Sequence, residues 1–131
     1  MRPKRAIEFS YKVDRGVASP IIPVEINGVI LDAYVDSGAF FSVFSAEDAP
    51  IAGINFQLGK KSHIMVGDGS LIPVYFHILP IKIGPISFQA NIGFSPKLGI
   101  GFNLIGRKDI FTRFIVIFND TKRKITFIPQ R

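Results

Sequence analysis

Glycine and proline interrupt this sequence so often that long helices are excluded. Twelve Gly and nine Pro recur among 131 residues, and short runs of Ile, Val, Phe and Tyr lie between them. Gly and Pro disfavour helix interiors, while β-branched and aromatic residues favour strands. We therefore expect a mainly β fold, a closed or folded-over β-barrel of many short strands with one or two short helices.

Two hairpins are indicated by turn residues between apolar runs. Asn27-Gly28 separates the runs 21–26 and 29–35, and both of its residues accept the positive φ that a two-residue hairpin turn requires. A second hairpin is expected over residues 63–76, with the glycine-bracketed Gly67-Asp68-Gly69-Ser70 at its tip.

Other apolar runs predict further strands, and two segments predict short helices. The expected strands cover residues 78–83, 86–92, 114–118 and 125–128. Because the run 114–118 is apolar throughout, we expect that strand to be buried on both faces. The expected helices cover residues 45–49, with Ser45 as a cap, and residues 108–114, with apolar side chains on one face.

The composition is that of a single folded domain. Apolar residues make up 47% of the chain, and 13 residues are Phe, which excludes intrinsic disorder. There is no Cys, so disulfides, thiolate catalysis and Cys-based metal sites are excluded. The two histidines, His63 and His77, lie in predicted strands and are interpreted as structural or surface residues.

The charge pattern points to an ordinary surface. The net charge is +6, and basic residues gather mainly at the two ends and in the turn Lys122-Arg123-Lys124. A basic barrel that binds nucleic acid is an alternative, but most Phe lies in apolar runs rather than among basic residues, so we expect no nucleic-acid partner. No apolar run approaches the roughly 20 residues of a membrane span, and Glu8 and Lys12 break any signal-peptide core. We expect a cytoplasmic protein without a membrane partner.

One carboxylate directly follows a run that should be buried strand. Asp36 is followed by Ser37, Gly38 and Ala39, and Asp both disfavours strands and is costly to bury alone. The simplest interpretation is a tight turn in which Asp36 accepts hydrogen bonds from nearby backbone N–H groups. A functional carboxylate is the competing interpretation.

The wider context resembles the retropepsin-like aspartic proteases, the single-domain family that includes the retroviral enzymes and bacterial relatives. Asp36-Ser37-Gly38-Ala39 matches the motif around their catalytic aspartate, and Leu104-Ile105-Gly106 matches a later tripeptide that packs against that loop and opens a helix. The segment from Gly106 to Phe114 looks like the bacterial and archaeal members. The tip formed by Val66, Gly67, Asp68, Gly69 and Ser70 falls where the family has its flap. The likeness covers residues 20–129.

The resemblance implies a homodimeric aspartic endopeptidase without a metal or cofactor. Each chain would supply one Asp36, and the two carboxyls would share a proton because both cannot ionise cheaply at short distance. They would activate a water that attacks the peptide carbonyl. Ser37 would bond across the dimer axis, Gly38 would leave space beside the carboxylates, and Ala39 would help to bind substrate backbone.

Two departures from the family pattern are visible. Retroviral members carry an acid four residues after the catalytic aspartate, which pairs with the arginine after the later glycine; here Phe40 occupies that place, although Arg107 is present. The flap tip also carries Asp68 and Ser70. An acid at position 68 would either shift the working pH of the carboxyl pair or point to solvent.

The expected organisation is a basic and polar extension over residues 1–19, followed by the protease-like domain over residues 20–131. The C-terminal strand 125–128 is a candidate interface element, because relatives pair their chains through terminal strands. The alternative function is a catalytically silent dimer of the same fold that binds peptides or assembles partners. The substrate and its sequence preference are not indicated by the sequence.

Overall fold

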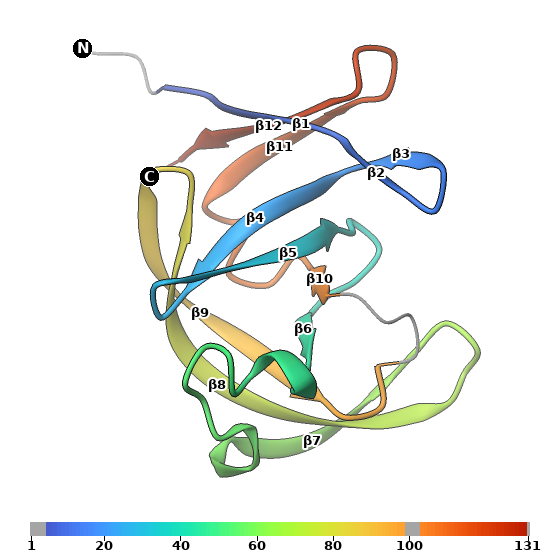
Figure 1. The fold of residues 1–131 in the computed structure, drawn as a ribbon, viewed down its shortest axis with the longest axis vertical. Coiled ribbons are helices and arrows are strands. Elements are labelled where there is room, and N and C mark those ends of the chain that lie inside the picture. Colours follow the sequence, from blue (N-terminus) through green and yellow to red (C-terminus); the bar gives the residue numbers. More distant parts are fainter. Residues whose placement is uncertain (1–4, 99–102, 131) are drawn as a thin grey trace.

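The computed structural model describes residues 5–98 and 103–130, and regular structure in these residues is almost entirely β (Figure 1). The two helices are short 3-10 turns, η1 (Ala46–Asp48) and η2 (Phe56–Leu58). The strands are β1 (Ile7–Ser10), β2 (Lys12–Asp14), β3 (Val17–Ser19), β4 (Ile21–Ile26), β5 (Val29–Val35), β6 (Ser42–Ser45), β7 (Lys60–Met65), β8 (Leu71–Ile83), β9 (Ile86–Ser95), β10 (Asn103–Ile105), β11 (Phe114–Asn119) and β12 (Lys124–Pro129).

The main sheet closes on itself. Its strand order is β4-β5-β10-β6-β9-β8-β7, and β4 also pairs with β8. The closing pairs are Glu25 with Lys82 and Ile26 with Ile81. All of these strands except β7 therefore form a ring, and β7 extends from it as an edge strand. The expected mainly β, closed fold is confirmed.

The first predicted hairpin forms over the predicted residues. β4 and β5 pair antiparallel from Ile21 with Tyr34 to Ile26 with Val29. Asn27 and Gly28 at its turn have φ values of 51° and 81°, which is the left-handed region that an Asn-Gly turn supplies. Alternate residues of β5 are buried in the core. This packing fixes the position of Asp36, the residue that follows the strand.

The second hairpin is longer than the sequence predicts. β7 begins at Lys60, and β8 runs from Leu71 to Ile83 as one strand where two were expected. β8 contains Pro73 and Pro80, and each pairs with one neighbouring strand only. A proline fits such a position because its missing N–H can face the unpaired side. The strand therefore continues through both prolines.

A separate three-stranded sheet lies at one end of the molecule, in the order β1-β12-β11 (Figure 1). Residues 5–19, which the sequence pattern leaves unplaced, supply β1 and the small β2–β3 hairpin. Ile7 of β1 pairs with Phe127 and packs into the core. Because β12 lies between β1 and β11, the C-terminal strand is paired on both edges from Lys124 to Phe127.

The expectation that residues 114–118 are buried on both faces is wrong. Phe114 is buried, but Ile115 and Ile117 remain 48% and 44% exposed. β11 is an edge strand of a single-layered sheet, so only the face with Phe114 and Val116 packs against the core. An unbroken apolar run therefore does not mean two covered faces in this chain.

The helix expected over residues 108–114 does not form; successive hydrogen-bonded turns take its place. The N–H of Phe111 bonds to the carbonyl of Arg107, and that of Phe114 to the carbonyl of Ile110. Asp109 between them has a φ of 66°, and its carboxylate accepts the backbone N–H of Asn91 at 2.8 Å. This left-handed residue interrupts the helical path. The predicted turn at residues 45–49 does form as η1, and the Ser45 hydroxyl accepts the N–H of Glu47.

A buried amide fastens the middle of the ring. Asn103 in β10 is 5% exposed, and its side-chain NH₂ donates to the carbonyl of Asp32 and the carboxylate of Asp48. Its side-chain oxygen accepts the N–H of Ser45 at 2.8 Å. A buried amide with all these partners stabilises the junction of β5, β6 and β10. Within the described residues no helix is long and apolar enough to cross a membrane.

Candidate active site

Asp36 stands at the end of β5, in an exposed turn. Its backbone N–H donates to the carbonyl of Ile105 at 2.9 Å, which ties the turn to β10. Its Oδ1 accepts the backbone N–H of Gly38 at 2.9 Å, and the N–H of Ala39 bonds to the Asp36 carbonyl. The turn thus has the local hydrogen bonds expected of a tight turn in which Asp36 accepts a nearby backbone N–H. It also fixes the orientation of an exposed carboxylate.

The space beside this carboxylate at Gly38 is narrow. A Cβ on Gly38 would lie 3.2 Å from Oδ1 of Asp36, closer than ordinary contacts. A side chain there would press on the oxygen that the Gly38 N–H holds. Ser37, between the two residues, is exposed in the single chain.

The segment after β10 braces the Asp36 turn from behind. The N–H of Gly106 donates to the Ser42 hydroxyl at 3.0 Å, and the N–H of Arg107 donates to the carbonyl of Ala39 at 2.9 Å. A Cβ on Gly106 would lie 2.3 Å from the carbonyl oxygen of Phe41, so this contact requires glycine. The two sequence motifs, about 70 residues apart, therefore pack directly together.

Arg107 takes an aromatic partner in place of a carboxylate. Its guanidinium lies over the ring of Phe40, 5.6 Å from the centroid. Phe40 is 50% exposed and meets Phe41 edge to face at 4.8 Å between centroids. A cation over an aromatic face is attracted by the ring quadrupole. The residue that replaces the expected acid is thus itself the partner of the arginine.

The tip of the β7–β8 hairpin is held by its own acid. The Asp68 carboxylate accepts both the backbone N–H and the hydroxyl of Ser70. The N–H of Val66 bonds to the carbonyl of Ser70, and Gly69 adopts a φ of 85°. The hydrogen bonds from Ser70 lower the pKa of Asp68 below its ordinary value. The Asp68 carboxylate therefore stabilises the conformation of the hairpin tip.

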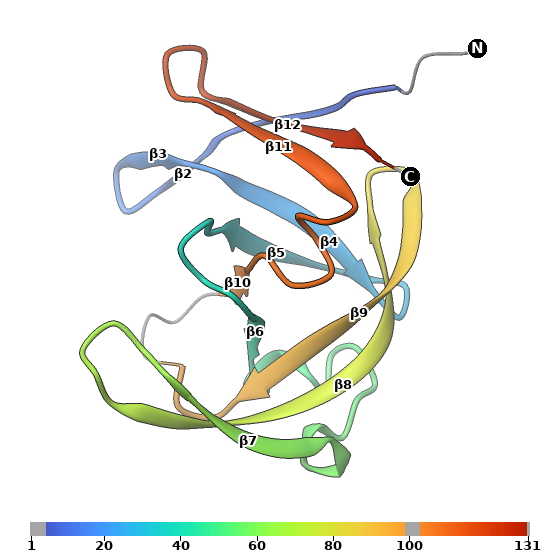
Figure 2. The same cartoon turned by 180° about the vertical axis from the view of Figure 1, so that it is seen from behind.

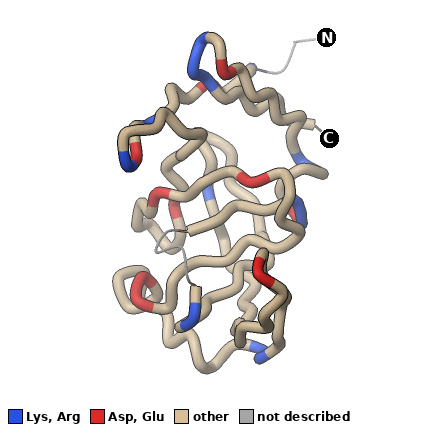
Figure 3. The backbone as a smooth tube through the Cα atoms, turned by 90° about the vertical axis from the view of Figure 1, so that its right-hand side faces the viewer, with Lys and Arg blue, Asp and Glu red and all other residues tan. Residues whose placement is uncertain are grey.

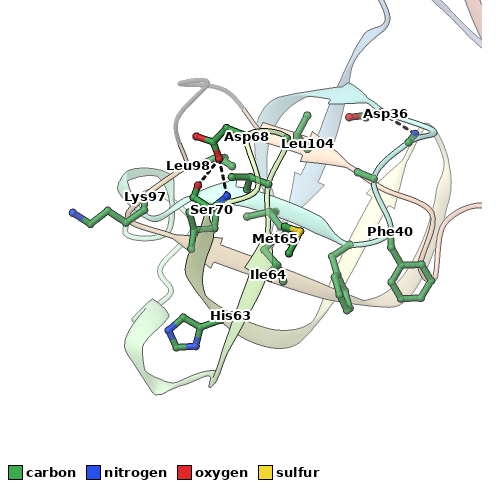
Figure 4. Close-up of a pocket in the computed structure, with 17 residues that line it drawn as sticks. Asp36, Phe40, His63, Ile64, Met65, Asp68, Ser70, Lys97, Leu98 and Leu104 are labelled. Atoms are coloured by element: carbon green, nitrogen blue, oxygen red, sulfur yellow. Dashed lines mark hydrogen bonds between the residues drawn. The ribbon is translucent and has the colours of Figure 1, made fainter.

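The Asp36 turn and this hairpin both line a cavity of about 1100 Å³ (Figure 4). Asp36 lies at one side and the Asp68 tip at another (Figure 4). The charged or titratable lining residues are Asp36, His63, Asp68 and Lys97. The rest of the lining is largely apolar and comprises Gly38, Ala39, Phe40, Phe41, Val43, Ile64, Met65, Val66, Gly67, Ser70, Ile72, Leu98 and Leu104.

The ribbon explains why these distant segments meet. The loop that follows β5 and the tip of the β7–β8 hairpin project on the same side of the molecule in both views (Figures 1 and 2). Among the predicted site residues, Ser37 and Gly69 lie in the same turns but outside the cavity lining of the described chain. Ile105 and Gly106 are buried behind the Asp36 turn. Arg107 contacts Phe40, which in turn lines the cavity.

Several lining residues are not singled out by the sequence pattern. Ile64 and Ile72 were expected only as strand residues of the 63–76 hairpin and Leu98 was not assigned a role, yet all three line the cavity. The strand β7 reads Lys-Lys-Ser-His-Ile-Met, so no alternation of polar and apolar residues marks Ile64 as a lining residue. His63 also lines the cavity as an exposed residue, whereas His77 bonds to the carbonyl of Phe56 at 2.8 Å and packs against Phe94.

The described residues contain no cluster of three or more His, Asp or Glu that could hold a metal ion. Basic residues are spread along the chain among acidic ones in the view of Figure 3. The polar chemistry of the cavity therefore centres on carboxylates, an imidazole and an ammonium group.

Comparison with known proteins gives a clear fold and no sequence relative. No protein-family model matches the sequence, and no curated protein matches it. A retropepsin-like aspartic protease from Rickettsia conorii has a similar structure, with a TM-score of 0.72 over 93% of this chain and 98% of that chain, at 19% identity. EIAV protease, solved with the inhibitor HBY-793, gives a TM-score of 0.57 over 73% of this chain and 88% of that chain, at 18% identity.

The chain therefore has the retropepsin-like fold, as its motifs predict. The first neighbour is described as an aspartic protease and the second as a protease, and at this identity the similarity is one of fold.

Proposed function

We propose that this protein is a homodimeric aspartic endopeptidase in which each chain supplies one Asp36. The observation that carries the proposal is the position of Asp36: an exposed, oriented carboxylate at the side of a large apolar cavity, beneath a hairpin. A carboxylate at this place in a retropepsin-like fold supports peptide hydrolysis.

In this proposal the second carboxylate comes from a second chain. The 131 residues contain one Asp-Ser-Gly motif, at Asp36. The exposure of Asp36, Ser37 and Gly38 in the single chain is consistent with a partner that covers this turn. Since Lys124 to Phe127 of β12 are paired on both edges, the terminal sheet would contribute to a dimer through its exposed face, through β11 or through the end of β12.

In the proposed dimer, the two Asp36 carboxyls share one proton and titrate as a pair. The ionised member takes a proton from a bound water, which attacks the carbonyl carbon of the peptide. The protonated member donates its proton to the carbonyl oxygen, and a tetrahedral intermediate results. Backbone groups at Gly38 and Ala39 would bind the substrate main chain, and the Val66–Ser70 tip would close over it and exclude water.

The test is cleavage of an unfolded protein mixture between about pH 3 and pH 7, the range in which shared carboxylates work. Products are identified by mass spectrometry. We expect cleavage by the wild type and none by Asp36→Asn. Asp32→Asn is the matched control, because Asp32 lies on the same strand but pairs with Lys12 on the surface. Cleavage that survives in Asp36→Asn contradicts the proposal. A folded dimer that cuts nothing at any pH favours the peptide-binding alternative.

A further inference from the structure

A second cavity, of about 630 Å³, adjoins the first along the β7–β8 hairpin. Phe41 lines both cavities, and its ring packs on that of Phe76 with 4.9 Å between the centroids. This aromatic pair forms the divide between them. The first cavity contains Asp36, and the second lies beyond the pair, towards the start of β7.

One face of β7 contributes to both cavities, and His63 and Met65 of its other face also line the first. Lys60 and Ser62 line the second cavity and Ile64 lines the first, and these alternate residues of β7 share a face. Their partners on β8 are Phe76, Val74 and Ile72 in turn. From the Ile64–Ile72 pair to the Lys60–Phe76 pair is four residues, or about 13 Å of extended chain.

The chemistry of the second cavity differs from that of the first. Its floor is apolar, formed by Phe76 and by Ile78, which is 75% exposed. Lys60 and Lys108 stand on its walls, and neither forms an ion pair with another residue of the described ranges 5–98 and 103–130. The acid of its lining, Asp109, already accepts the backbone N–H of Asn91.

We propose that the second cavity is a distal subsite for an acidic side chain of an extended peptide whose centre lies at Asp36. The inference rests on the proposed function, because only that activity makes the bound peptide a substrate. A strand-like peptide along this face passes from the apolar first cavity over Phe41 and reaches the two ammonium groups about four residues further on. The recognised sequence therefore has apolar residues near the scissile bond and Glu or Asp near its distal end.

Binding tests this inference separately from cleavage. The full-length Asp36→Asn protein is titrated into fluorescein-labelled twelve-residue peptides with an apolar centre. Glu, Gln or Lys is placed in turn at each position three to six residues from that centre. We expect Glu at one of these positions to bind about threefold to tenfold more tightly than Gln, the range for one or two partly exposed charge pairs, and Lys to bind most weakly.

Charge reversal of each lysine identifies the groups responsible. Lys60→Glu and Lys108→Glu should each remove the preference for Glu, and together they should reverse it in favour of Lys. Lys61→Glu is the matched control: Lys61 is the next residue on β7, points to the opposite face and lies over the ring of Tyr75. Circular dichroism checks that each variant is folded.

Equal binding of the Glu, Gln and Lys peptides overturns the inference, as does a preference lost equally in Lys61→Glu, or no binding of any peptide. If the preference for Glu depends on Lys60 while the wild type cuts nothing, the distal subsite stands and the proposed activity fails. If the wild type cuts peptides without regard to acidic residues, the activity stands and the distal subsite fails.

Discussion

The guanidinium of Arg107 lies 5.6 Å from the centroid of the Phe40 ring, so a cation–π contact joins the Asp36 loop to the segment after β10. The same two segments are joined by the backbone bonds from Arg107 to Ala39 and from Lys108 to Phe40. The loop is therefore held by main-chain and side-chain contacts together.

We expect the Phe40–Arg107 contact to be measurable in a double-mutant cycle. Phe40→Leu, Arg107→Met and the double variant are unfolded in urea, and their free energies of unfolding are compared. A coupling energy of about 0.5–1 kcal/mol is expected for a cation–π pair at a half-exposed site. Strictly additive effects contradict a direct contact.

Gly106 should tolerate no side chain. In Gly106→Ala the new Cβ would meet the Phe41 carbonyl oxygen at 2.3 Å, and a backbone atom cannot move aside cheaply. We expect a loss of about 2 kcal/mol or more in the free energy of unfolding. Gly67→Ala is the control, since its Cβ would meet nothing within 4 Å, and it should change stability little. Similar losses for the two variants are incompatible with the close packing at Gly106.

The hairpin tip should loosen in acid through Asp68. Hydrogen bonds from Ser70 lower the pKa of Asp68, so the ionised carboxylate stabilises the folded tip. That stabilisation is complete above the ordinary carboxyl pKa and is lost as the pH falls through the lowered pKa. In Ser70→Ala the pKa of Asp68 should rise towards its ordinary value, so the carboxylate contributes less stability and the folded tip takes up its proton at higher pH. An NMR titration of the Asp68 carboxyl carbon measures this, and an unchanged midpoint contradicts the role of Ser70.

The Tyr11 phenol should ionise only in strongly alkaline solution. Its hydroxyl donates to Asp120 at 2.7 Å, and burial together with this acid raises its pKa from 10.0 to about 12. The neutral phenol stabilises the fold below pH 10, and this contribution disappears as the pH rises towards 12. The chain has three Tyr and no Trp, so phenolate absorbance follows each step. Tyr11→Phe should remove the step near pH 12; its persistence would assign that step to another residue.

The elements that were predicted correctly are those whose conformation is set by local turn residues. Asn27-Gly28 has few alternatives to a left-handed hairpin turn, and its flanking strands form over the predicted residues. The bond from the Gly38 N–H to Asp36 is likewise local. The pairing of Gly106 with the Asp36 turn is long-range and was expected only through the family resemblance.

The errors arise where tertiary context overrides a local pattern. Residues 108–114 have helical periodicity, but Asp109 adopts a left-handed conformation, and its carboxylate accepts the N–H of Asn91. The run 114–118 is apolar, but its exposure depends on whether anything covers β11, which periodicity does not encode. The second cavity depends on which residues of β7 pair with which residues of β8. The sequence of a single strand does not determine this pairing.

The most direct test of a site shared between two chains is a subunit-mixing experiment. Wild-type and Asp36→Asn chains are unfolded, mixed in varying ratio and refolded together, and endopeptidase activity is measured at constant total protein. If each active unit needs two Asp36 carboxylates, activity follows the square of the wild-type fraction and falls to about one quarter in an equal mixture. Activity that falls in direct proportion, to about one half, means that each chain works alone and contradicts the shared pair of carboxylates.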